Sequence, residues 1–96
     1  MLNGWKRMRP YLSNLENLKK QCRELFHERC VVCGRYSRIV HEIIPRSSGK
    51  IAINLDNMVV LCNICHDQAH RVGSEIAEET LKLYREDAIK RYANSP

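Results

Sequence analysis

Long hydrophobic runs are missing from this sequence, and its first eleven residues are basic rather than apolar. A membrane-spanning helix needs about 20 mostly apolar residues, and a secretory signal needs a shorter apolar segment. The sequence therefore predicts neither a membrane span nor export. Internal repeats and low-complexity segments are also missing. Together with a length of 96 residues, this predicts one domain in a reducing cytoplasm.

The chain has five cysteines, an odd number that does not suit a complete set of disulfides. Four of them form two Cys-x-x-Cys pairs, Cys30 with Cys33 and Cys62 with Cys65, and Cys22 is left over. Two intervening residues let both sulfurs of a pair point at one ion, so the pairs predict a single tetrahedral structural zinc. Disulfides or free thiols are the alternatives. Such a metal would stabilise a core that is small at this chain length.

Acidic residues are the minority charge. Sixteen Lys and Arg oppose eleven Asp and Glu, so the formal net charge is +5. Four thiolates and one Zn²⁺ change this charge by −4 + 2, which leaves +3 from the initial +5. A basic surface favours a polyanion, and nucleic acid is the common one. A soluble basic protein without such a partner fits the charge equally well.

Residues 1–29 are expected to form a basic segment followed by a helix. Ser13 and Glu16 have the spacing of a capping box, which predicts a helix over 14–27. Apolar residues repeat along it at helical spacing and should form one packing stripe: Leu15, Leu18, Cys22, Leu25 and Phe26. The segment before the helix interleaves basic and aromatic residues, namely Trp5, Lys6, Arg7, Arg9 and Tyr11. These residue types can contact DNA, and the alternative is a terminus without a partner.

The remaining chain divides into a central part, 30–72, and a C-terminal helix within 73–96. β-Branched residues predict strands over 38–44 and 58–61, and a helix after Cys65 should end at Gly73. The last helix, over 75–92, has acidic residues near its start and basic residues near its end. One packing stripe is expected on it: Ala77, Leu81, Tyr84, Ala88 and Tyr92.

A second group of metal-competent residues follows the cysteines closely. His66 and His70 are four residues apart on a predicted helix, so they share one face and can hold one divalent ion. Because His66 directly follows Cys65, the structural zinc would determine where it points. His41 and Glu42, on the predicted facing strand, are the candidates to complete the shell.

Taken in order, these residues resemble a known family. Cys30-x-x-Cys33, His41-Glu42-Ile-Ile-Pro45, Asn57 and Leu61-Cys62-x-x-Cys65-His66 resemble the zinc-stapled His-Asn-His (HNH) endonucleases. The resemblance covers about residues 30–70. It implies an α+β fold with a ββα-metal core around one catalytic divalent ion, either Mg²⁺, Mn²⁺, Ni²⁺ or Zn²⁺, with helices on both flanks. It also implies hydrolysis of DNA phosphodiester bonds.

The resemblance also implies individual roles. His41 and His66 fall on metal-ligand positions, and His70 on an extra ligand position that some members have. Asn57 falls on an asparagine that bonds backbone and orients the base, and Glu42 falls on the base itself, where the family usually has histidine. A carboxylate is unprotonated at neutral pH but is a weaker base than imidazole. Two alternatives stay open: Glu42 binds the ion while His41 is the base, or catalysis is lost and DNA binding is retained.

The expected partner is DNA. Arg46 and Lys50, on the turn after the motif, are candidates to clamp neighbouring phosphates. Cutting both strands with one active site per chain would need a homodimer or two separate cleavage events. A partner in a DNA-processing assembly is the other expectation. Small members of this kind are frequent in phages, which implies the cytoplasm of a host cell. The rival function is a non-catalytic, zinc-dependent nucleic-acid-binding module or a subunit of such an assembly.

Overall fold

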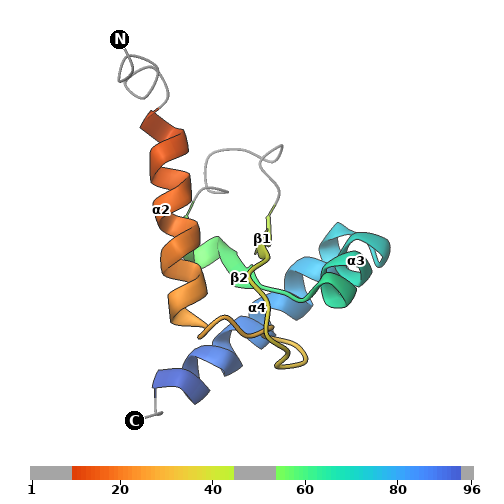
Figure 1. Ribbon diagram of the computed structural model, residues 1–96. Coiled ribbons are helices and arrows are strands. Elements are labelled where there is room, and N and C mark those ends of the chain that lie inside the picture. The colour runs from red at the N-terminus through yellow and green to blue at the C-terminus, as the bar shows by residue number, and fades with distance from the viewer. Residues whose placement is uncertain (1–9, 45–53, 94–96) are drawn as a thin grey trace.

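The computed structural model describes residues 10–44 and 54–93. The short sheet lies between α2 and the pair formed by α3 and α4 (Figure 1). This is the predicted α+β architecture. In chain order the elements are α2 (Pro10–Leu25), β1 (Val40–Glu42), the 3₁₀ helix η2 (Leu55–Asn57), β2 (Met58–Val60), α3 (Asn63–Arg71) and α4 (Ser74–Ala93).

The sheet consists of β1 and β2 paired antiparallel, with His41 opposite Val59. The other edge of β2 is covered, because the Val31 N–H donates to the Val60 carbonyl at 2.9 Å. All three residues of β2 are fully buried. Both strands are shorter than the sequence predicted. Beyond Glu42, the Ile43 N–H still donates to the Asn57 carbonyl across the sheet, but the Ile44 N–H donates to the Asn57 side chain instead.

Helix α2 begins at Pro10, four residues before the predicted start. Proline suits a first helical turn, because its missing N–H would have no partner there. Ser13 therefore lies inside the helix, and the predicted capping box is wrong. The predicted stripe does pack inward, and Leu15, Cys22 and Phe26 are buried.

The end of α2 is a tight reversal that the sequence did not indicate. The His27 N–H donates to the Glu24 carbonyl, and the Glu28 N–H donates to the Arg23 carbonyl. These are the two bonds of a Schellman motif, and they require positive φ angles of 56° at His27 and 54° at Glu28. The His27 ring stacks on Tyr92 of α4 at 4.7 Å. The reversal thus ends the helix and turns the chain toward the first cysteine pair.

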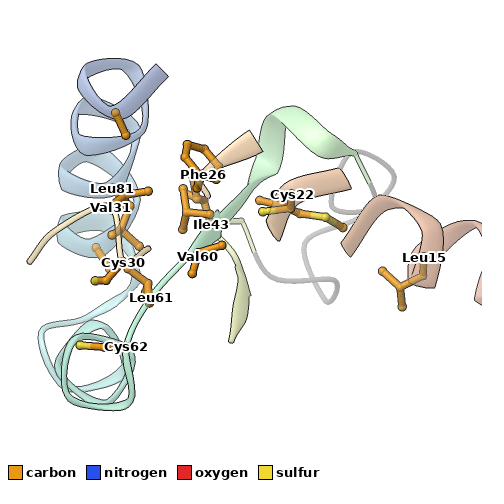
Figure 2. Packing of buried hydrophobic residues seen from close by; sticks show 14 residues of the cluster. Leu15, Cys22, Phe26, Cys30, Val31, Ile43, Val60, Leu61, Cys62 and Leu81 are labelled. Atoms are coloured by element: carbon orange, nitrogen blue, oxygen red, sulfur yellow. The ribbon is translucent and has the colours of Figure 1, made fainter. Parts of the chain in front are cut away.

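The core is one cluster centred on β2 and Leu61. In Figure 2, Leu81 and Val31 gather on the α4 side of the cluster, while Cys22 lies toward α2. Because elements from both ends of the chain cover β2, its side chains are buried regardless of which way they point. Strand β2 therefore joins the N-terminal helix α2 to the C-terminal helix α4 through one shared core.

Helix α4 packs through a stripe slightly rotated from the predicted one. Ala77, Leu81 and Ala88 are buried as expected, but Tyr84 is 38% exposed. The inward position after Leu81 is taken instead by Arg85, whose side chain is only 12% exposed. Sequence patterns assign arginine to the surface, which explains the error. Within the described ranges, no helix is long and apolar enough to span a membrane.

Candidate metal centres and active site

The first cysteine pair sits on a tight turn after the end of α2. The Cys30 N–H donates to the Arg35 carbonyl at 2.8 Å, and the Gly34 N–H donates to the Cys30 carbonyl at 2.9 Å. Gly34 has a φ of 80°, which glycine adopts without steric cost. The turn therefore presents the sulfurs of Cys30 and Cys33 on one side.

The second pair begins α3. Cys62 is the N-cap residue, and its sulfur accepts the Cys65 backbone N–H at 3.4 Å. The sulfurs of Cys33 and Cys62 are 3.5 Å apart, and all four sulfurs lie within 4.8 Å of one another. Tetrahedral zinc with bonds of about 2.3 Å places its sulfurs about 3.8 Å apart. The structure has these cysteines as free thiols rather than disulfides, so the four are positioned to bind a metal ion and are consistent with structural zinc.

The thiols influence one another electrostatically. Burial raises the pKa of Cys62, but hydrogen bonds from the Cys65 N–H and from the neighbouring thiols outweigh it and lower that pKa to about 7. Burial and hydrogen bonds to Cys62 and Cys30 raise the pKa of Cys65. One sulfur is therefore already disposed to be a thiolate, and a divalent cation would deprotonate the others. This donor set fits Zn²⁺.

A second cluster is formed by three histidines. His41 comes from β1, and His66 and His70 come from successive turns of α3. One ligand atom from each lies within 4.8 Å of the others, and the Nε2 atoms of His66 and His70 are 3.3 Å apart. The ring centroids of His41 and His66 are separated by 5.1 Å. The sheet thus presents a third imidazole to the two-histidine face of α3.

The histidine cluster favours neutral rings. Burial, followed by the charges of His66 and His70, lowers the pKa of His41 to about 4. Burial and the His70 charge also lower the pKa of His66. At neutral pH both rings therefore carry a free lone pair, which is the form that binds a metal. Three imidazole nitrogens suit Zn²⁺ or Ni²⁺ better than they suit Mg²⁺.

Glu42 lies next to the cluster in sequence but not within it. It is the last residue of β1, half-buried, and stands opposite Met58. Among the described residues, the group whose ligand atoms lie within 4.8 Å contains the three histidines and not Glu42. Successive residues of a strand point to opposite faces, which accounts for the difference between His41 and Glu42.

Asn57 connects η2 to the end of β1. Its Oδ1 accepts the Ile44 N–H at 2.9 Å, and its Nδ2 donates to the Ile44 carbonyl at 2.9 Å. Its backbone carbonyl also accepts the Ile43 N–H at 2.8 Å. The residue is buried, although its side-chain bonds to Ile44 are only partly buried. They determine where the chain goes directly after His41 and Glu42.

One further positioning residue escaped sequence reasoning. The buried Ser37 hydroxyl donates to the Leu61 carbonyl at 2.7 Å and accepts the Ile39 N–H at 3.1 Å. It therefore ties the segment entering β1 to the residue before Cys62. A single loop serine carries no pattern that would have pointed to this.

The expected phosphate contacts Arg46 and Lys50 lie outside the described residues, as does the basic aromatic segment before Pro10.

Comparison with known proteins gives one match. The family model for HNH endonucleases matches residues 20–71, which is more than half of the chain and includes both clusters. No curated protein and no solved structure matches the chain. The matched domain implies nuclease or nucleic-acid-binding activity. On the strength of this match, the chain belongs to the HNH endonuclease family.

Proposed function

We propose that this protein is a metal-dependent endonuclease that hydrolyses phosphodiester bonds of DNA at the three-histidine cluster. The observation that supports this most is the convergence of His41, His66 and His70 from two separate elements. A purely structural zinc domain needs the four cysteines only. Membership in the HNH family agrees with nucleic acid as the substrate.

In this proposal the three imidazoles hold the catalytic ion, and the four cysteines hold a structural zinc. A divalent ion at the cluster would supply charge stabilisation for the phosphate and for the leaving 3′ oxygen. Zn²⁺ and Ni²⁺ rank ahead of Mn²⁺ and Mg²⁺ because the donors are nitrogens. The position of His41 among the ligands argues against the exchanged roles in which His41 is the base.

Glu42 is then the proposed general base. On a regular strand it would point away from His41, so this role requires the end of β1 to be irregular enough for the Glu42 carboxylate to reach the water at the ion. Glu42 takes a proton from the water that attacks phosphorus in line with the leaving oxygen. Glu42 directly follows His41 on β1 and lies outside the group of three histidines, so the proposal gives it a proton to accept rather than an ion to bind. Asn57 positions it indirectly, by holding the backbone of Ile43 and Ile44. Arg46 and Lys50 remain the proposed phosphate contacts.

The second candidate function is DNA binding without cleavage. It is favoured by one observation, the carboxylate at position 42 where the family usually has an imidazole. The same fold, structural zinc and DNA contacts would serve such a module. It would not depend on an ion at the histidine cluster, and this difference separates the two functions experimentally.

The test uses the zinc-loaded protein and supercoiled plasmid, with Mn²⁺, Ni²⁺, Mg²⁺, additional Zn²⁺ or EDTA in parallel. We expect nicked product first, since each chain has one such cluster among its described residues. His66→Ala should abolish nicking, whereas His27→Asn should retain it because His27 lies outside the cluster and asparagine tolerates positive φ. Glu42→Gln tests the base. DNA binding without nicking under every ion would instead establish the binding module.

A further inference from the structure

Arg85 is a largely buried charge in the middle of α4, beyond the region that matches the HNH family. Its side chain is 12% exposed, although arginine is rarely buried without a partner. Its guanidinium lies over the Phe26 ring at 5.7 Å. The Asp56 carboxylate is 3.9 Å away but 89% exposed, so solvent screens this pair and it does not account for the burial.

The main partners of Arg85 are two backbone carbonyls. Its Nε donates to the Met58 carbonyl at 3.1 Å, and its second terminal nitrogen donates to the Leu55 carbonyl at 3.0 Å. Leu55 and Met58 lie on either side of Asn57 in the sequence. The planar fork of the guanidinium therefore spans η2 and the first residue of β2. A lysine has one compact charge and cannot reproduce this geometry.

The Met58 carbonyl needs a donor from outside the sheet. In an antiparallel pair, alternate residues direct their N–H and C=O groups toward the partner strand and away from it. Asn57 bonds to Ile43 across the sheet, so Met58 faces the other way. On that side Arg85 donates a hydrogen bond to the Met58 carbonyl, just as the Val31 N–H donates to the Val60 carbonyl. Without Arg85, a carbonyl of a fully buried residue would lose its partner.

From these contacts a continuous path leads to the proposed active site. Arg85 holds both flanks of Asn57, and Asn57 holds Ile44 through the oxygen and the nitrogen of its side-chain amide. Ile44 is two residues from Glu42 and three from His41. The position of β1 against α3 therefore depends on an arginine of α4.

We propose that Arg85 is a positioning residue of the active site, and that α4 is part of the working nuclease rather than an appended helix. The proposal rests on the proposed function for its catalytic consequence. Its structural consequence, a fixed end of β1, can be measured without any cleavage. An error of about 1 Å in the placement of catalytic groups can reduce the rate about a hundredfold, so the effect should be large.

The experiment compares Arg85→Met with Arg91→Met in the zinc-loaded protein. Both variants remove one positive charge from α4, and Arg91 also donates to a backbone carbonyl, that of Val31 at 3.4 Å. Amide hydrogen exchange followed by NMR is the first readout. Arg85→Met should accelerate exchange at Ile44 by at least about tenfold relative to Val31, and Arg91→Met should not. Arg85→Lys should recover only part of the protection at Ile44.

Cleavage kinetics give the second readout. In Arg85→Met, kcat should fall about 10- to 100-fold while KM for DNA stays near that of Arg91→Met. Unchanged exchange at Ile44, or equal acceleration at Ile44 and Val31, would overturn the proposal, because it would show no effect or a general loss of stability. A fall in kcat that Arg91→Met reproduces would also overturn it. If the wild-type protein cleaves no DNA, the exchange readout still decides the role of Arg85.

Discussion

The cysteine cluster and the histidine cluster meet in α3, where Cys65 and His66 are neighbours, yet they are built differently. Four sulfurs lie close enough to fill a tetrahedral shell, and Cys30 and Cys62 are almost fully buried while Cys33 is exposed. Among the three imidazoles, His41 and His66 are half-buried and His70 is exposed. Structural zinc sites are closed, whereas catalytic sites keep a position open for water or substrate. Adjacent residues of one helix thus belong to a four-ligand cluster and to a three-ligand cluster, which are the numbers of protein ligands expected of a structural and of a catalytic site.

We expect the cysteine cluster to be required for folding. Cys62→Ser removes one ligand and the sulfur that caps α3. Structural zinc contributes on the order of 10 kcal/mol to folding of small domains, which is comparable to the whole stability of a domain. We therefore expect loss of the cooperative thermal transition measured by circular dichroism. A variant that still melts cooperatively within a few degrees of wild type would remove the distinction between the clusters.

We expect the histidine cluster to be required for nicking activity and to contribute little to the free energy of unfolding. His66→Ala should reduce nicking at least about a hundredfold, since even residues that only orient a ligand cost 10- to 100-fold. The midpoint of thermal unfolding should change by only a few degrees, because a half-exposed side chain outside the core is removed. Plasmid nicking and calorimetry on one preparation test both statements. Unfolding of His66→Ala would contradict the assignment of stability to the cysteines.

Asn57 should affect both stability and activity, because its hydrogen bonds join η2 to the end of β1. Asn57→Ala leaves the N–H and the carbonyl of Ile44 without their side-chain partner. A fully buried unsatisfied group costs about 1–3 kcal/mol. Because these two bonds are only partly buried, urea unfolding should show a total loss of about 1–3 kcal/mol, together with slower nicking. Asn57→Asp keeps the acceptor and should lie between alanine and wild type. An alanine variant with normal stability and normal nicking would contradict a structural role for the Asn57 side chain.

The smallest effect is expected for the fifth cysteine. Burial raises the pKa of Cys22 to about 12, opposed by the charges of Arg85 and Arg23. The thiolate is the reactive form, so iodoacetamide at pH 8 should leave Cys22 unmodified in the folded protein and label it after unfolding. Because the folded thiol holds its proton, its contribution to stability is lost as pH rises above about 8.5, where the unfolded thiol ionises. Mass spectrometry after labelling is the measurement, and rapid native labelling of Cys22 would contradict the burial.

Sequence patterns were most informative where the interacting residues are close in the chain. The Cys-x-x-Cys pairs indicated their convergence, and the apolar spacing of Leu15, Cys22 and Phe26 indicated the buried face of α2. Patterns failed at the ends of elements. The reversal at His27 and Glu28 uses positive φ angles that non-glycine residues seldom adopt. The capping signal at Ser13 was misleading because the helix begins earlier, at a proline.

By itself, the sequence determined the two cysteine pairs and the shared helical face of His66 and His70, because these depend on spacing within a few residues. The α+β class followed from the resemblance of these motifs to the HNH endonucleases. Only the tertiary structure decided that His41 joins that face while Glu42 does not, because strand pairing and alternation set their directions. It also decided that Arg85 is buried against the carbonyls around Asn57. That contact joins residues about thirty positions apart, and no local pattern records it, because a buried arginine is stable only where the fold supplies its acceptors.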